Sequence, residues 1–169
     1  MRVCENYLLL QNLYKKSKLA DLGSKYSQLF FAELIATFIF VFIAIGSINS
    51  ALYFSSPLTE VGLIIIALGN GLAIFISIAS MSRISGAHLN PAVTLAMLIA
   101  GKIDIVKSFI YIAGQLSGSC LAALSVSFFI WSGSDTATGA HSLADGISLS
   151  DGVIIEFALT FVLVFTVFS

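Results

Sequence analysis

The sequence predicts an all-α membrane protein with four spanning helices and one half-length helix that enters and leaves the membrane on the same side. Three observations support this prediction. The 169 residues are 58% hydrophobic and 10% charged, whereas about a quarter of the residues in an average soluble domain are charged. The charged residues stand between long uncharged runs. One of these runs begins with polar residues and a helix-start signal. A water-soluble globule is therefore excluded.

Four runs are long enough to cross a bilayer, which takes about 20 mostly apolar residues. Two of them, Val61–Ser82 and Ser108–Trp131, contain no charged residue, and a third, Leu29–Ser50, contains Glu33 near its start and is uncharged from there on. The fourth, Gly152–Ser169, likewise contains one charged residue, Glu156. Each run is predicted to form one spanning helix, and Cys120 is expected to pack within the third.

The basic residues predict the orientation and the division of the chain. All eight Lys and Arg residues lie before the first span or between the second and the third. The positive-inside rule then places the N-terminus in the cytoplasm. The predicted parts are a cytoplasmic tail (1–27), a first half with three spans (28–131), a non-cytoplasmic loop (132–151) and the fourth span (152–169). The residues leave open whether the membrane is vacuolar or plasma membrane.

The segment 84–101 is as long as a span but has basic residues on both sides. If it crossed the membrane, Arg83 and Lys102 would lie on opposite faces, against the pattern of the other spans. We therefore predict a re-entrant segment. Asn is a preferred N-cap and Pro is favoured at the first helical position, so Asn90 and Pro91 predict a half-helix that starts at mid-membrane. A helix start at that depth is tolerated only inside protein or beside a watery cavity, which favours a pore.

The first and fourth spans share a pattern with two polar positions. Glu33-Leu-Ile-Ala-Thr37 recurs as Glu156-Phe-Ala-Leu-Thr160, at an offset of 156 − 33 = 123 residues. Three spans separate the starts of the two copies, so the copies run in opposite directions, as in inverted-repeat transport proteins. An ionisable residue inside a span is by default functional or paired.

The composition also limits the function. The formal net charge of −1 provides no basic field for nucleic acid, so no nucleic-acid partner is expected. The two cysteines are too few for a metal-binding pattern. With no phosphate-binding loop and no pair of nucleophile and base in the sequence, we expect no enzyme, no metal and no cofactor.

The segment Ser85-Gly-Ala-His-Leu-Asn90-Pro91-Ala92-Val-Thr94 resembles the first signature of the aquaporin, or major intrinsic protein, family. The repeated Glu-x-x-x-Thr helices and Ala113-Gly-Gln115-Leu-Ser-Gly118 resemble the same family, and within it the plant tonoplast intrinsic proteins. The resemblance runs from about Gln28 to the last residue. It implies an aquaporin-like right-handed helical bundle in the lipid bilayer, homotetramers, and passive passage of water and small neutral solutes such as glycerol and urea.

The resemblance also implies site residues. Asn90, Pro91 and Ala92 would line the pore, with the Asn90 amide donating to a passing water oxygen. Gly86, Ala87 and His88 would supply a track of carbonyl acceptors, although the His88 side chain could instead anchor the loop by hydrogen bonding.

Two further roles follow from the same resemblance. Asn70 would belong to the selectivity filter, where its small amide would tolerate solutes such as glycerol or urea; the alternative is a helix-packing Asn. Glu33 and Glu156 would accept hydrogen bonds from loop amides, because a fixed re-entrant loop needs acceptors inside the membrane.

The sequence as given has no counterpart of the family's fifth and sixth helices, second Asn-Pro-Ala half-helix or filter arginine. The expected bundle is therefore incomplete, with 152–169 as the first helix of a truncated second half-repeat. Our first hypothesis is an N-terminal portion of a channel. The alternative is a non-conducting membrane protein that associates with full-length channel subunits.

Overall fold

The computed structural model describes residues 2–54, 59–129 and 139–169, with side chains from Lys15 onward in these ranges. Within this part of the chain the fold contains five helices and no strand. Four are long and apolar enough to cross a membrane, which confirms the all-α prediction and its four spans. In chain order the helices are α1 (Arg2–Phe54), α2 (Glu60–Met81), α3 (Pro91–Ile99), α4 (Ile105–Phe129) and α5 (Leu149–Phe168).

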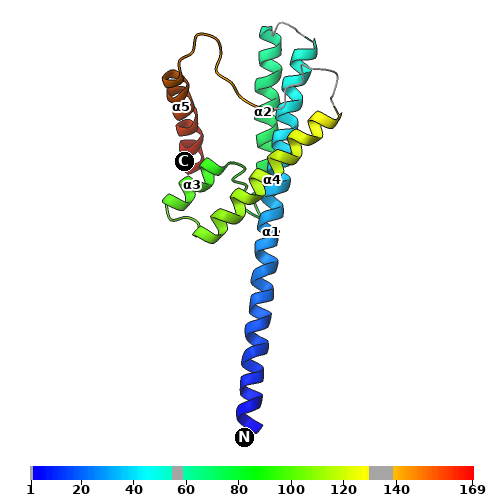
Figure 1. Cartoon of the computed structure of the whole chain (residues 1–169), viewed down its shortest axis with the longest axis vertical. Helices are drawn as coiled ribbons and strands as arrows, with labels where there is room; N and C mark the ends of the chain where they lie inside the picture. Colours follow the sequence, from blue (N-terminus) through cyan, green and yellow to red (C-terminus); the bar gives the residue numbers. More distant parts are fainter. Residues whose placement is uncertain (1, 55–58, 130–138) are drawn as a thin grey trace.

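Helix α1 is much longer than a span. Residues 2–27, expected as a tail, continue the first spanning helix without a break and project from the bundle as a single rod (Figure 1). The 26 helical residues before position 28 correspond to roughly 39 Å at about 1.5 Å per residue. No proline interrupts this stretch, so nothing in its backbone chemistry stops the helix.

Helices α2 and α4 pack along the C-terminal part of α1, beyond the projecting rod (Figure 1). The contact with α4 is close because glycines face the α1 backbone. A Cβ atom built on Gly114 would lie 2.7 Å from the Phe30 carbonyl oxygen, and one on Gly118 would overlap the carbonyl oxygen of Leu34. Small residues at this spacing allow membrane helices to approach closely. Any larger side chain at these two positions would push α4 away from α1.

The re-entrant loop is inserted between α1 and α2. Its apolar side chains Ala87 and Leu89 are 6% and 4% exposed and form a core cluster with Ala36 of α1. Ile74 and Met81 of α2 pack against this cluster. The loop is therefore held inside the protein, as the prediction of a buried helix start requires.

Capping residues shift two helix starts. Helix α4 begins at Ile105, three residues before the expected Ser108, because the Asp104 carboxylate accepts the amide of Lys107 at 2.9 Å. Helix α5 begins at Leu149, three residues before the expected Gly152, with Ser148 as its N-cap. Both are ordinary capping arrangements. The expected end of the third span at Trp131 and the loop residues 132–138 lie outside the described residues.

Helix α5 stands apart from the other spans. Among the described helices it contacts only α3 (Figure 1), and large apolar side chains on several of its sides are exposed, among them Val153, Phe157, Leu159 and Phe165. A helix that is apolar all round is buried in protein or in lipid. Here the surroundings of α5 are therefore lipid or further membrane helices.

Candidate functional site

The half-helix α3 begins at the Asn-Pro pair. Asn90 is its N-cap, with φ −142° and ψ 128°, and its Oδ1 accepts from the amide of Ala92 at 2.8 Å. Pro91 is the first helical residue. The Asn90 oxygen is thus engaged, whereas no described residue bonds its Nδ2 group.

Helix α3 is short because its other end is also capped. Gly101 adopts φ +68°, its amide donates to Leu98, and the amide of Lys102 donates to Met97. This is a Schellman ending, which favours glycine at the left-handed position. Nine helical residues at about 1.5 Å each span roughly 14 Å, about half the hydrocarbon thickness.

The loop before α3 has an unusual backbone. Gly86, Ala87 and Leu89 have φ values of +92°, +51° and +60°. For residues other than glycine this left-handed region costs roughly 1–2 kcal/mol each, and such conformations persist only where the surroundings fix them. Inside this protein, the fixing groups are hydrogen-bond acceptors and donors from α1 and α4.

Glu33 of α1 is the main acceptor. It is fully buried, at 0% exposure, and both carboxylate oxygens bond the loop. Oε1 accepts from the Ser85 hydroxyl at 2.5 Å and from the His88 amide at 3.0 Å. Oε2 accepts from the Leu89 amide at 2.9 Å and from Gln115 Nε2 at 2.8 Å. Backbone amides inside a membrane must be bonded within the protein, and Glu33 bonds two of them.

Tyr111 of helix α4 makes two further contacts with the loop. The Tyr111 hydroxyl donates to the Ser85 carbonyl, and its ring packs edge-on against His88 with centroids 4.9 Å apart. Gln115 Nε2 also donates to Thr94 Oγ1 at 2.9 Å. The roles of Tyr111 and Thr94 as loop contacts, and of Gln115 as a link between Glu33 and Thr94, were missed by sequence reasoning. The polar side chains of Thr94 and of the third span, inside otherwise apolar helices, could have indicated these hydrogen bonds.

The remaining expected pore residues lie in and around the loop. His88, Pro91 and Ala92 are partly buried and Gly86 is exposed. None of the described residues donates a hydrogen bond to the carbonyls of Gly86, Ala87 or His88, so these oxygens remain available as acceptors. The His88 ring bonds Thr94 through Nδ1, at 3.1 Å from Oγ1, so its side chain makes the loop contact considered as the alternative.

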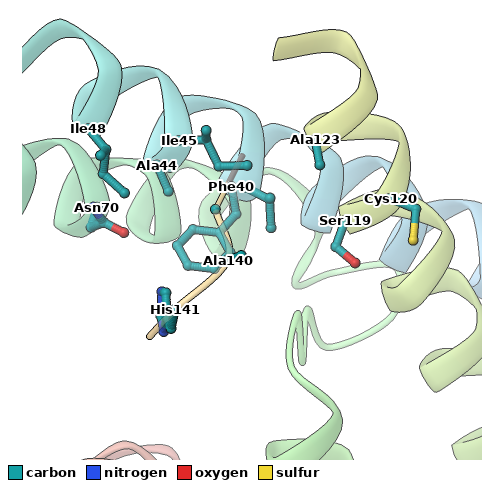
Figure 2. Close-up of a pocket in the computed structure, with 12 residues that line it drawn as sticks. Phe40, Ala44, Ile45, Ile48, Asn70, Ser119, Cys120, Ala123, Ala140 and His141 are labelled. Carbon is teal, nitrogen blue, oxygen red and sulfur yellow. The ribbon is translucent and has the colours of Figure 1, made fainter. Parts of the chain in front are cut away.

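A cavity of about 430 Å³ lies further along α1. Figure 2 shows Phe40 of α1, Asn70 of α2 and His141 of the segment before α5 around the same space. Ala44 lies eleven residues beyond Glu33, or roughly 16 Å along the helix. Asn70 Nδ2 donates to the Ile66 carbonyl at 2.8 Å. The lining residues of α4 are Ser119, Cys120 and Ala123.

The expectation that Cys120 packs within the third span is wrong. Cys120 is exposed and borders the cavity together with Asn70 and His141 (Figure 2). The sequence did not predict that these three residues line one cavity, because this depends on where the segment 139–141 folds back against α1. Gly139 shows that contact, since a Cβ atom built there would lie 2.8 Å from Ile45 Cδ1.

Glu156 differs from Glu33, its counterpart in the repeat. Glu156 is exposed, and no described residue hydrogen-bonds its carboxylate. It borders a second cavity of about 510 Å³ between α5 and the segment 142–147. The structure therefore brings Glu33 to a re-entrant loop but leaves Glu156 exposed at the edge of this second cavity. No group of three or more metal-ligating side chains occurs in the described part of the chain.

Comparison with known proteins agrees with this geometry. Residues 22–169 match the family model described as "Major intrinsic protein". "Probable aquaporin TIP2-2" of Arabidopsis thaliana is 34% identical over 160 residues, 91% of this chain and 63% of the relative. "Aquaporin TIP4-4" of Zea mays is 39% identical and "Probable aquaporin TIP-type RB7-5A" of Nicotiana tabacum 37% identical, each over 140 residues, 82% of this chain and 55% of the relative.

These matches confirm the resemblance to tonoplast-type aquaporins. The chain spans 55–63% of the length of these relatives. Aquaporins are channels rather than enzymes, which agrees with the expectation that the chain is no enzyme. Its four apolar helices and its matches make it a multi-pass integral membrane protein. By its matching residues, its repeated helices and its Asn90-capped half-helix, the chain belongs to the major intrinsic protein family.

Proposed function

We propose that this chain is an N-terminal portion of a passive membrane channel for water and small neutral solutes. The observation that carries the proposal is the Asn90-capped start of α3, held inside the protein by a fully buried Glu33. Non-helical backbone and a helix start at membrane depth are tolerated only where they are buried in protein or line a water-filled cavity. Secondary transporters of other folds use such half-helix starts at solute sites.

The chemistry of the loop fits a neutral solute. Asn90 Nδ2 donates to a water or hydroxyl oxygen, and the carbonyls of Gly86, Ala87 and His88 accept its hydrogens. The start of α3 carries about half a positive charge, which opposes the passage of protons and other cations. Pro91 and Ala92 complete the wall at this point.

Asn70 acts as a filter residue in this proposal. It lies in the middle of α2 and borders the 430 Å³ cavity. Its Nδ2 group is engaged with Ile66, so its oxygen is the free polar atom. An amide is smaller than an aromatic ring, which favours passage of glycerol or urea beside water. His141 borders the same space.

Glu156 is proposed as the anchor of a second re-entrant loop. The support is the repeat, because Glu33 occupies the same position in its own helix and bonds two loop amides. The present exposure of Glu156 is what an acceptor without its loop would show.

The membrane and the orientation are part of the proposal. Tonoplast-type relatives support the vacuolar membrane, and the eight basic residues support a cytoplasmic N-terminus. A fluorescent protein fused at the N-terminus should mark the vacuolar membrane and be removed by protease added on the cytoplasmic side. Labelling of the plasma membrane alone, or protection of the fusion from that protease, would contradict this part.

The exposed surface of α5 favours a second candidate, a subunit that associates with related channel subunits instead of conducting by itself. The family resemblance implies homotetramers, and mixed assemblies bury the same surfaces. Co-expression with a complete aquaporin decides between the two. An associating subunit co-purifies and changes the water permeability of its partner, whereas a channel portion leaves that permeability unchanged.

The proposal requires the cavity at Asn70 to hold water. Thiols react as thiolates, which form in water and not in hydrocarbon. In a Cys4→Ser, Cys120→Ser background reconstituted in liposomes, Asn70→Cys should react with a charged, membrane-impermeant thiol reagent. Leu72→Cys is the matched control, because Leu72 is 58% exposed two residues away and points to the opposite side of α2. Equal rates at both positions would contradict a water-filled cavity.

A further inference from the structure

The carboxamide of Gln115 links three elements. Its Nε2 atom lies 2.8 Å from Oε2 of Glu33 on α1 and 2.9 Å from Oγ1 of Thr94 on α3. The three residues are 0–1% exposed. Thr94 Oγ1 in turn lies 3.1 Å from Nδ1 of His88 in the re-entrant loop. A continuous chain of hydrogen bonds thus runs from Glu33 through Gln115 and Thr94 to His88.

Which group donates and which accepts along this series of hydrogen bonds follows from Glu33, its first member. Glu33 meets four donors: the amides of His88 and Leu89, Gln115 Nε2, and the Ser85 hydroxyl. The Ser85 oxygen accepts from the amide of Ala87 at 3.0 Å, and Glu33 Oε1 is the acceptor within reach of its hydroxyl among the described residues, so the Ser85 proton is directed at Glu33. Four donors require the acceptor-only, ionised carboxylate.

Because Glu33 only accepts, Gln115 must present its NH₂ group. The two hydrogens of that group serve Glu33 and Thr94, so the Thr94 oxygen accepts from Gln115. The hydroxyl proton of Thr94 is then free to be donated to His88 Nδ1. The Oε1 atom of Gln115 is buried without a partner among the described residues. Turning the amide over would place that oxygen against the Glu33 carboxylate, so the unpaired oxygen is the less costly arrangement.

We propose that Gln115 is a positioning residue that fixes the tautomer of His88, with Nδ1 bare and the proton on Nε2. The ring is held in place by Tyr111, whose ring centroid is 4.9 Å away. Nε2 has no hydrogen-bond partner among the described residues. It lies near the Gly86 backbone, 3.8 Å from where a Cβ atom would be, on a side chain that is partly exposed.

The consequence concerns the chemistry of the loop, and it rests on the proposed function. The Nε2–H group adds a fixed donor near the Gly86 backbone, in the same loop as the proposed carbonyl acceptors of Gly86 and Ala87. A water molecule there meets a donor and acceptors together, so its orientation is set before it reaches Asn90. With the other tautomer, His88 would present a third acceptor at the same place.

The test reads the tautomer directly and needs no permeation. The chain contains two histidines, so His141→Gln leaves only His88. Nitrogen-15 NMR of this histidine-labelled chain in lipid distinguishes a protonated from a bare ring nitrogen. We expect a protonated Nε2 and a bare Nδ1. In Gln115→Met, which has a similar volume and no donor, Thr94 is free to accept. A second pair of resonances from the Nδ1–H tautomer should then appear. Thr94→Ser, which keeps the hydroxyl, should retain the single tautomer.

Three results would overturn the proposal: an Nδ1–H tautomer in the parent chain, a doubly protonated ring, or an unchanged spectrum in Gln115→Met. If Gln115→Met does not fold, Gln115→Leu takes its place. The parent spectrum alone still tests whether Thr94 donates its hydrogen bond to His88 Nδ1. A packing role for Gln115 would lower stability without changing the tautomer. Failure of the permeation experiments would leave this spectrum unaffected, so the two proposals fail separately.

Discussion

Glu33 on α1 and Leu89 in the re-entrant loop are joined by a hydrogen bond of 2.9 Å, from the Leu89 amide to carboxylate Oε2. Leu89 has a left-handed backbone, with φ +60°, and the carboxylate is fully buried. A costly backbone conformation and a costly buried charge thus stabilise each other. This pair sets the depth at which α3 begins.

Glu33→Gln should destabilise the loop strongly. A glutamine has one oxygen, so two of the four donors around position 33 would face an NH₂ group. Each lost bond to a charged group contributes about 1.5–3 kcal/mol, so we expect a loss on the order of 3 kcal/mol or more. Denaturant unfolding and hydrogen exchange at the His88 and Leu89 amides measure it. Glu156→Gln is the matched control and should change stability by less than about 0.5 kcal/mol. Equal effects at the two positions would contradict the assignment.

Gly118→Ala should weaken the contact between α1 and α4. The added Cβ would overlap the Leu34 carbonyl oxygen and lie 3.0 Å from the Phe38 amide nitrogen, and backbone atoms cannot rotate away. Overpacking of this kind costs typically about 1–3 kcal/mol. Gly46→Ala, with no atom within 4 Å of its Cβ, should instead stabilise α1 by about 0.5–1 kcal/mol. Thermal unfolding in detergent compares the two, and a neutral Gly118→Ala would show that the helices are further apart.

Asp104→Ala should destabilise the start of α4 in a pH-dependent way. The backbone hydrogen bond from Lys107 lowers the pKa of the Asp104 carboxyl, and the Lys107 ammonium adds to this effect. A carboxyl with a lowered pKa stabilises the fold above its ordinary value of about 3.9 and loses that contribution as the pH falls through the folded value. The stability difference between parent and variant should thus be full at pH 7 and shrink below about pH 4. Asp145→Ala, at an exposed loop carboxyl, is the control. A difference that stays constant down to pH 3 would contradict the capping role.

Asn70→Phe should narrow the filter. A phenyl ring fills part of the 430 Å³ cavity and removes the free amide oxygen, so glycerol and urea should be excluded more than water. Solute-swelling assays measure the ratio of solute to water permeability in a complete channel that contains this chain. An unchanged ratio would favour the alternative of an Asn that only packs between helices.

The sequence predicts those features that depend on nearby residues. Asn90, Pro91 and the apolar run after them define α3, because capping is a matter of three or four consecutive residues. The re-entrant path follows from Arg83 and Lys102, since the charge rule acts on each connection separately.

The features that depend on distant contacts could not be predicted in the same way. Cys120 and His141 border one cavity with Asn70 only because a segment about 70 residues after Asn70 folds back against α1. Tyr111 bonds the Ser85 carbonyl, and a backbone acceptor leaves no mark in the sequence. The helical state of residues 2–27 was also missed, because the stretch was assigned from its basic residues, and these predict the side of the membrane and not the secondary structure.

The central claim is that Asn90 presents a hydrogen-bond donor inside a water-filled pore. Stopped-flow osmotic shrinkage of proteoliposomes tests it most directly. The chain is joined to the remaining C-terminal part of its Arabidopsis relative, of which it spans 63%. Asn90→Asp keeps an oxygen that can cap α3 and replaces the Nδ2 donor with a carboxylate oxygen, which accepts instead of donating and carries negative charge. The variant therefore changes the chemistry of the pore and keeps the cap of the helix. We predict fast shrinkage for the parent and shrinkage near the rate of empty liposomes for Asn90→Asp. Equal rates for the two, or no permeability in the parent, would contradict the account.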